Sequence, residues 1–478
     1  MSNCNKLFRD FNNEITPTSK EMSKMKTSRV ALEEKIRIKI WDKLGVHIDF
    51  YSQGSSVYRM KTLIIKEDGT YDADRGIFLP IKPDESPQTV QGWVLDAVNG
   101  HTHDGASHRN KCIRVYYKAA YNIDFPIYYE IPADGISYLA TKGGVWVRDD
   151  PAEMIDWFLK FKDEDGQLIR VIKYLKAWAS KCAFKMPSGI ALSVWAARNF
   201  TAVADRDDEC LLALLKAIRN TVYYGVSCIS PVAPYDDFTA KMSQLQKDTF
   251  RSELDDFCSD AQKAIDENNQ LKASKIWRKN LGNRFALGAD EDVDARAAEL
   301  MASASTILSG ARLDNNGKIN STSGVPHQPH RNYGAKRGNR YLPVKKTNPQ
   351  KIALLEERIL KEHFSFLKTR AANGVLNVYG SFQPTTLSPV YHYRITYRGN
   401  RYPEVRILRP TVAYHDDIHL YSDRSLCLFY PKDFSWHKHS KLFNTIVPWT
   451  HEWFVFYELY QITGKWHHPF VDHKRIQN

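Results

Sequence analysis

Asp72-Ala73-Asp74 and Ile123-Asp124-Phe125-Pro126-Ile127-Tyr128, preceded by Gln53-Gly54-Ser55-Ser56, are the stretches that decide the expected fold of this chain. Two carboxylates at positions i and i+2 of a strand point to the same face, where they can share hard divalent cations. A helix that begins at Gly54-Ser55 offers backbone N–H groups and the positive end of its dipole to a triphosphate. A third carboxylate, Asp124, lies in an apolar strand, where burial is costly unless the group is paired or bound to metal. The ordered set predicts a two-metal site for in-line attack on an α-phosphate.

The order of these stretches carries the prediction, because each stretch is weak alone. With 55 acidic residues among 478, roughly six acidic-x-acidic pairs arise by chance. An aspartate at the end of a strand can also simply cap a turn, and this reading stays open at the level of single residues. A Gly-Ser turn, then paired carboxylates on a strand, then a buried aspartate favour the site.

The composition is that of a globular protein with two or three domains. No run of 18 or more apolar residues occurs, so no membrane span is expected. The first residues lack the apolar segment of a signal peptide, which predicts a cytoplasmic location. The seven cysteines are scattered without CxxC spacing, which disfavours a disulfide framework. The net charge of +12 favours anionic ligands.

The secondary-structure pattern predicts an α+β fold. Residues 23–44 have a helical pattern that ends at Gly45, a helix stop signal. Strands are expected over 46–50, 63–65, 76–79, 113–117 and 123–128. Helices are expected over 168–180, 189–200, 209–222, 248–268 and 292–308. A small mixed sheet followed by a helical lobe is therefore predicted.

In the remaining third of the chain, the sequence predicts a linker followed by a second folded region. Residues 309–348 lack sustained periodicity and are rich in Gly, Asn, Ser, Pro and basic residues, so they are expected to be a flexible basic linker. No acidic residue occurs from Lys318 to Lys351, so a nucleic-acid contact stays open beside the solvated linker, which is favoured. Beyond it, a helix around 352–360, strands over 391–397 and 405–408, and an aromatic helix over 450–462 are expected.

The first constellation resembles the bacterial cGAS/DncV-like nucleotidyltransferases, which make cyclic di- or trinucleotide signals in anti-phage (CBASS) defence. The resemblance lies in the motif Asp72-x-Asp74-x-Gly76 and in the stretches around it. It extends to residues 171–178 and 186–188, so that it covers about residues 1–308. It implies a polymerase-β-type nucleotidyltransferase core that binds Mg²⁺ (or Mn²⁺) through Asp72, Asp74 and Asp124. It also implies contacts to a nucleoside triphosphate from Gln53, Gly54, Ser55, Lys173 and Ser188. By chemistry alone, an exposed helical lysine is the favoured reading of Lys173. Ser188 could cap the helix from Gly189 onward and also donate to phosphate.

The function that this resemblance implies is a cyclic oligonucleotide synthase that makes a second messenger from NTPs. Asp72 and Asp74 would hold both metals, and Asp124 would assist the metal that activates the attacking hydroxyl. A cyclic-nucleotide-responsive effector is then expected downstream. The alternative is a linear nucleotide-adding transferase of the polymerase-β type, whose products keep phosphatase-sensitive ends.

The second constellation surrounds Cys427, in Leu426-Cys427-Leu428-Phe429-Tyr430-Pro431. A helix, a meander, a cysteine-bearing segment and a closing helix over 349–478 resemble a ubiquitin-conjugating (UBC-type) α+β domain, as in the conjugating-enzyme-like proteins that accompany CBASS cyclases. The resemblance implies that Cys427 forms a thioester, which needs a thiolate and partial exposure, and that the domain conjugates a protein partner and regulates the cyclase. The alternatives are core packing of Cys427 and a non-catalytic interaction module.

The sequence departs from the UBC pattern ahead of the cysteine. Conjugating enzymes carry His-Pro-Asn there, and this chain has Tyr414-His415-Asp416-Asp417-Ile418-His419. His419 or His415 is the candidate substitute donor or base, with a turn histidine as the equal alternative. Further histidines follow, but without a second cysteine or regular ligand spacing they disfavour zinc; they are His437, His439, His451, His467, His468 and His473.

Overall fold

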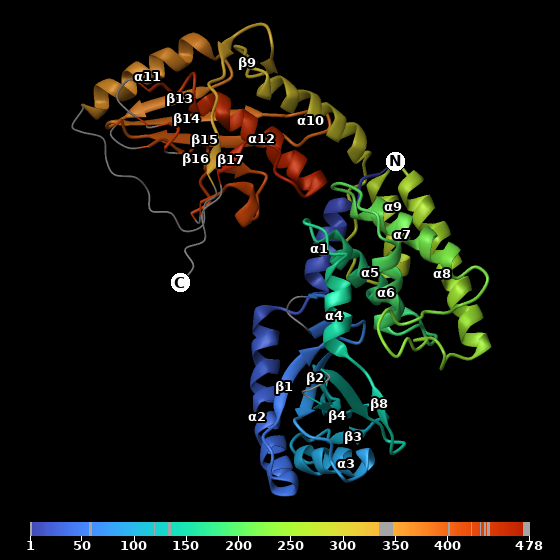
Figure 1. Cartoon of the computed structure of the whole chain (residues 1–478). Coiled ribbons are helices and arrows are strands. Elements are labelled where there is room, and N and C mark those ends of the chain that lie inside the picture. Colours follow the sequence, from blue (N-terminus) through green and yellow to red (C-terminus); the bar gives the residue numbers. More distant parts are fainter. Residues whose placement is uncertain are drawn as a thin grey trace. The chain divides into compact units, whose positions relative to one another are not determined.

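The computed structural model of the chain describes residues 2–56, 60–118, 120–131, 135–333, 348–399, 402–421, 423–430, 432–434, 436 and 440–471 (Figure 1). The chain forms two compact units, Met1–Glu291 and Asp292–Asn478. The first combines a mixed sheet with a helical lobe, and the second combines an antiparallel sheet with helices. The predicted α+β class is therefore confirmed.

The sheet of the first unit is organised around its long strand β2 (Tyr71–Leu79). The first half of β2 pairs in parallel with β5 (Tyr121–Phe125), and the second half pairs in parallel with β6 (Ile127–Ile131). Strand β1 (Asp49–Gln53) pairs with β2 in antiparallel fashion. The remaining strands are β3 (Ala106–His108), β4 (Ile113–Tyr117), β7 (Ile136–Ala140) and β8 (Trp146–Arg148).

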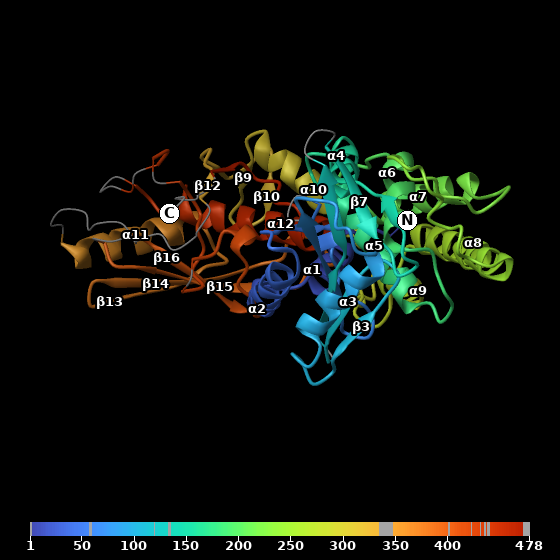
Figure 2. The same ribbon diagram turned by 60° about the horizontal axis from the view of Figure 1, so that its bottom comes forward.

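Two helices pack beside this sheet and beside each other (Figures 1 and 2). Helix α2 (Ser19–Leu44) begins earlier than the sequence predicts because Thr18 and Glu21 form a capping box. It ends as predicted at Gly45, whose φ of 63° suits the left-handed cap. Helix α3 (Pro87–Val98) follows β2.

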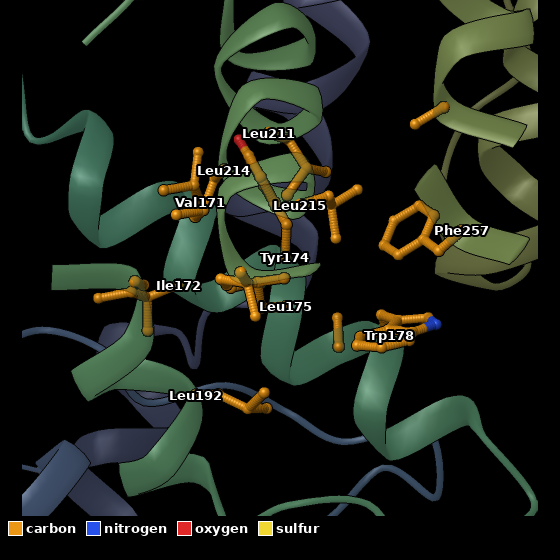
Figure 3. Packing of buried hydrophobic residues seen from close by; sticks show 14 of the residues in the cluster. Val171, Ile172, Tyr174, Leu175, Trp178, Leu192, Leu211, Leu214, Leu215 and Phe257 are labelled. Atoms are coloured by element: carbon orange, nitrogen blue, oxygen red, sulfur yellow. The ribbon is translucent and has the colours of Figure 1, made fainter. Parts of the chain in front are cut away.

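The helical lobe packs its own aromatic and aliphatic core. Figure 3 shows Tyr174 of α5 (Gln167–Lys181) beside Leu211 and Leu215 of α7 (Asp207–Thr221), and Trp178 of α5 on the side of Phe257. The rings of Trp178 and Phe257 are 5.2 Å apart. The other helices of the lobe are α1 (Asn5–Glu14), α4 (Pro151–Leu159), α6 (Gly189–Asn199), α8 (Gln244–Asp266) and α9 (Gln270–Leu281).

The second unit contains a four-stranded antiparallel meander, β13 (Lys368–Ala372), β14 (Val375–Phe382), β15 (Tyr391–Tyr397) and β16 (Glu404–Arg409). Helix α11 (Pro349–His363) precedes it and contacts β13 and β14. Helix α12 (Ile446–Thr463) packs on the sheet, where the rings of Phe454 and Tyr391 stack 4.5 Å apart. Helix α10 (Val293–Leu308) packs against α12.

The strand expected over 63–65 and the linker expected over 309–348 differ from the structure. Residues 63–65 form no strand; the segment connects to the lobe, and Ile65 donates its N–H to the carbonyl of Ile15 at 2.8 Å. The expected linker 309–348 begins inside the second unit, because Ala311 and Leu313 are buried in that unit's core. Its residues 309–333 form β9 (Arg312–Leu313), β10 (Ile319–Asn320), β11 (Val325–Pro326) and β12 (Asn332–Tyr333). Residues 334–347 of the expected linker lie outside the described residues.

Strand β12 pairs in parallel with β17 (Phe470–Val471) at the far end of the sequence. The four strands of this segment are only two residues long, which is too short for a period-two pattern. Among the helices that the structure describes, none is both long enough and apolar enough to cross a bilayer.

Candidate active site

The register of the sheet brings the three predicted aspartates to one place. Asp74 on β2 pairs directly with Asp124 on β5, and Asp72 pairs with Asn122. Because side chains alternate along a strand, Asp72 and Asp74 share one face of β2. Asp124 is 6% exposed. The structure therefore juxtaposes Asp72, Asp74 and Asp124 as the sequence predicts.

Arg114 supplies the main positive charge beside these carboxylates. Strand β4 pairs with β5 so that Arg114 lies opposite Asp124. The guanidinium makes a bidentate pair with that carboxylate, with Nε–Oδ1 at 2.7 Å and Nη2–Oδ2 at 2.6 Å. It also lies 3.6 Å from Asp72. The hydrogen bonds and charge of Asp124 outweigh the cost of burial and raise the pKa of Arg114. Arg114 is not predictable from the sequence, because its role depends on cross-strand register.

Asp72 is the second carboxylate that the protein neutralises. Lys66 forms an ion pair with it, and Asn122 Nδ2 donates to its Oδ1 at 2.8 Å. Burial acts to raise the pKa of Asp72, but these hydrogen bonds and the charges of Lys66 and Arg114 lower it below its ordinary value. Asp72 is therefore held as a carboxylate.

Asp74 is the carboxylate of the three whose negative charge is least favoured by its surroundings. Desolvation, followed by the negative charges of Asp124 and Asp72, raises the pKa of Asp74 to about 7. Gly54 approaches it so closely that a Cβ there would lie 2.7 Å from Asp74 Oδ2. A divalent cation would relieve the repulsion among the carboxylates, and carboxylate oxygens are the ligands that Mg²⁺ and Mn²⁺ take. The three carboxylates therefore fit such an ion. In this structure Arg114 and Lys66 contact oxygens of Asp124 and Asp72 that could face the ion.

Gln53, Gly54 and Ser55 lie at the end of β1, beside these carboxylates. Gln53 pairs with Asp74, and its Oε1 lies 3.1 Å from the hydroxyl of Tyr128. Gly54–Ser56 forms a single 3₁₀ turn, and residues 57–59 lie outside the described residues. A helix was expected to begin at Gly54, but the described residues form only this short turn. A turn of this length does not provide the helix dipole that was expected to face the triphosphate.

A pocket of about 410 Å³ opens next to the aspartates. Asp72, Lys66 and Ser55 line it, and the helical lobe contributes Lys176 from α5 and Met186. Its volume lies within the range of small-molecule sites, about 300–1,000 Å³. The pocket therefore combines hydrogen-bond donors, cations and an apolar wall beside the carboxylates.

The two residues predicted from the helical lobe lie near this pocket but do not line it. Lys173 on α5 is 5% exposed, and its Nζ donates to Thr16 Oγ1 at 2.8 Å. Ser188 caps α6, where its Oγ accepts from the N–H of Ala191 at 3.4 Å. Lys176, one turn after Lys173, is the lysine that lines the pocket, and it donates to the Thr62 carbonyl at 3.1 Å. Lys176 was not among the predicted residues, although its i+3 spacing from Lys173 could have identified it.

Cys427 and His419 are brought together in the second unit by backbone pairing. The N–H of Cys427 donates to the carbonyl of His419 at 2.9 Å. Cys427 is fully buried and His419 is 3% exposed, with its ring against Trp466 and Phe470. The partial exposure expected of Cys427 is therefore not met, because the segment packs both residues inward. His415 is exposed, and its Nδ1 lies 3.2 Å from the hydroxyl of Tyr460.

Comparison with known protein families gives one match in each unit. Residues 48–128 match the nucleotidyltransferase domain of the cyclic GMP-AMP synthase DncV-like family, and residues 356–474 match the Type II CBASS E2 protein family. A curated relative, the cyclic AMP-AMP-AMP synthase of Acinetobacter sp. (strain ATCC 27244 / 9458), is 24% identical over 196 residues. That alignment covers 38% of this chain and 55% of the synthase, so the chain spans about half the length of this relative.

Solved structures share the fold of the first part of the chain. The DncV cyclic AMP-GMP synthase of Vibrio cholerae superposes with a TM-score of 0.52 at 17% identity, and the match covers 60% of this chain and 98% of that one. Escherichia coli DncV, bound to 3'-deoxy GTP, gives a TM-score of 0.50 at 16% identity, with 57% and 93% covered.

Proposed function

We propose that this chain, in which a DncV-like nucleotidyltransferase domain is joined to a Type II CBASS E2 domain, synthesises a cyclic oligonucleotide from nucleoside triphosphates. One observation carries the proposal: Asp74 lies directly across from Asp124, with Asp72 on the same strand beside a pocket. The name of the curated relative, a cyclic AMP-AMP-AMP synthase, supports ring closure over linear nucleotide addition.

In the proposed site, residues of the sheet bind the metal, and residues of both the sheet unit's loops and the helical lobe contact the triphosphate. Asp72, Asp74 and Asp124 would hold Mg²⁺ or Mn²⁺, which when bound stabilises the charge that develops on the phosphate oxygens. Lys66, Lys176 and Ser55 line the pocket with donors that suit a triphosphate. Four further residues do not line the pocket but are proposed to hold the lining residues in place for these contacts: Gln53, Gly54, Lys173 and Ser188.

The chemical step follows from these positions. A ribose hydroxyl of one nucleotide attacks the α-phosphorus of another, a P–O bond forms, and the bond to pyrophosphate breaks. The hydroxyl proton passes to water. The pocket residues orient the triphosphate for in-line attack, and Arg114 fixes Asp124 by its bidentate pair. A second, intramolecular attack closes the ring.

The second unit is proposed to act on a protein partner through a Cys427 thioester, and thereby to regulate the synthase. For this to occur, the segment between His419 and Cys427 must open, because Cys427 is fully buried. That same burial favours a second candidate function, a non-catalytic interaction module. A cyclic-nucleotide-responsive effector completes the proposed defence pathway.

The nucleotide reaction is tested with the purified full chain, all four NTPs, and Mg²⁺ or Mn²⁺. We expect phosphatase-resistant rings by mass spectrometry and a loss of at least about 100-fold in rate in Asp72→Asn/Asp74→Asn. Asp68→Asn is the matched control, because Asp68 is an acidic residue that lines the same pocket but lies outside the triad. Products with phosphatase-sensitive ends would favour linear addition, and an unchanged rate in the double variant would refute the site.

A further inference from the structure

Four buried side chains with metal-binding donors converge inside the second unit. His327 and His330 lie in the segment that leads into β12, Glu452 lies on α12, and His468 precedes β17. The imidazoles of all three histidines face the one carboxylate. No side chain of the four is more than 4% exposed. Three segments far apart in the sequence thus place nitrogen and oxygen donors at one buried point.

The distances of His330 and His468 from Glu452 match metal ligands better than hydrogen bonds. His330 Nδ1 and His468 Nε2 lie 3.5 Å and 3.6 Å from Glu452 Oε2, and His327 Nδ1 contacts Glu452 Oε1. Hydrogen bonds of this kind are normally about 2.7–3.2 Å long. Two ligands at about 2.0–2.1 Å from a tetrahedral zinc lie about 3.4 Å apart. In the part of the chain that the structure describes, His330, Glu452 and His468 are the one set whose ligand atoms all lie within 4.8 Å of one another.

The hydrogen-bonding state of the histidines points the same way. The Nε2 atom of His327, whose Nδ1 contacts Glu452, has no hydrogen-bond partner among the described residues, which is costly for a buried group. His468 is oriented by its other nitrogen, Nδ1, which lies 3.0 Å from the carbonyl of Pro469. Metal-bound histidines commonly have such a backbone partner. The neighbouring His451 differs, because both of its nitrogens are partnered, by Tyr393 and Gly317 at 2.9 Å.

We propose that His330, Glu452 and His468 form a site for a divalent transition metal, with zinc as the expected ion and with His327 holding the other carboxylate oxygen of Glu452. Imidazole nitrogen and carboxylate oxygen atoms at this spacing are typical zinc ligands. Imidazole-rich sets also select such ions over Mg²⁺. This site is separate from the aspartates of the first unit and does not depend on the proposed nucleotide reaction.

The metal would fasten the segment before β12 to α12 and to the segment before β17. This position matters for the proposed thioester, because Asn332 Nδ2 donates to the carbonyl of Cys427 at 3.1 Å. A segment anchored at His327 and His330 thus supports the backbone of the cysteine segment. Both of these histidines lie before residue 356, where the match to the E2 family model begins.

The test measures metal content and stability in the full chain purified without chelators. We expect about one zinc per chain by plasma mass spectrometry. After chelator treatment, added Zn²⁺ should raise Tm by about 5 °C, and Co²⁺ should give the intense visible bands of tetrahedral coordination. A chain that holds no zinc and gains no stability from it would overturn the proposal and identify a metal-free histidine–glutamate network.

Variants separate this site from other metal binding. His330→Gln/Glu452→Gln should lose the zinc, whereas the matched control His451→Gln, on the same helix, should retain it. Asp72→Asn/Asp74→Asn should also retain it, which excludes the first unit as the source. Zinc that persists in the His330→Gln/Glu452→Gln variant would overturn the assignment. Should that variant fail to fold, the zinc content and Co²⁺ spectrum of the unaltered chain still decide.

Discussion

Two lysines on α5 bring positive charge into the interior of the first unit at some cost to stability. Burial, followed by the charges of Lys61 and Arg170, lowers the pKa of Lys173 to about 8. Burial also lowers the pKa of Lys176 to about 8, although the charge of Asp74 opposes the shift. These buried cations lower the stability of the fold, and they place charge that suits phosphate near the proposed nucleotide site.

We predict that Lys173→Met stabilises the protein at pH 7 by about 2 kcal/mol, because it removes a buried charge. Folding lowers the pKa of Lys173 from 10.5 to about 8, so between these values the unfolded chain binds more protons. The free energy of unfolding of the unaltered protein therefore rises with pH across that window, and the advantage of the variant should shrink there. Urea unfolding at pH 7 and pH 9.5 measures this, with Lys173→Arg as the charged control. An advantage of equal size at both pH values would contradict the prediction.

Strand β2 is the element that assembles the site, because it carries two carboxylates and pairs both with the strand of Asp124 and with β1, which leads into the turn at Gly54. Gly54 has a φ of 55°, which an L-residue rarely adopts. Its Cβ would also meet the Asp74 carboxylate. The turn thus fixes where that carboxylate lies.

Gly54→Ala should therefore reduce nucleotide synthesis by at least about tenfold while costing only about 1 kcal/mol of stability. Gly45→Ala is the matched control: Gly45 has a φ of 63°, but nothing lies within 4 Å of a Cβ there. We expect the control to lose similar stability and keep its activity. Equal activity losses in the two variants, measured with NTPs, would show that backbone strain and not the approach to Asp74 is responsible.

Elements with strong local signals were predictable, and cross-strand neighbours were not. The helix over 168–180 and the strand over 391–397 match α5 and β15 closely, because their apolar periods are long and clear. The aspartates were identified because their order along the chain reflects strand pairing. Arg114 and Lys176 were missed because only the register and helix packing bring them to the site. The cluster around Glu452 was missed because His327 and His330 fall in the expected linker.

At the scale of the whole molecule, two units with separate cores carry separate proposed chemistries. Each unit has its own sheet, and the proposed reactive residues, the three aspartates and Cys427, lie in different units. Nucleotidyl transfer and thioester formation share no side chain in this arrangement. Loss of one reaction should therefore leave the other chemically competent.

Cys427→Ala should abolish a reducing-agent-sensitive adduct between the full chain and an activated protein partner, while the purified variant makes nucleotide at the unaltered rate. Asp72→Asn/Asp74→Asn should show the reverse, an intact adduct without nucleotide product. Cys112→Ala is the control for the thiol, since Cys112 lies beside β4 in the first unit, where burial, followed by the charge of Asp124, raises its pKa to about 12 and keeps it protonated. Gel analysis with and without dithiothreitol measures the adduct, and mass spectrometry measures the nucleotide. An adduct that survives in Cys427→Ala would place the nucleophile elsewhere, and the absence of any adduct with every partner tested would make the second unit an interaction module, as the burial of Cys427 already favours.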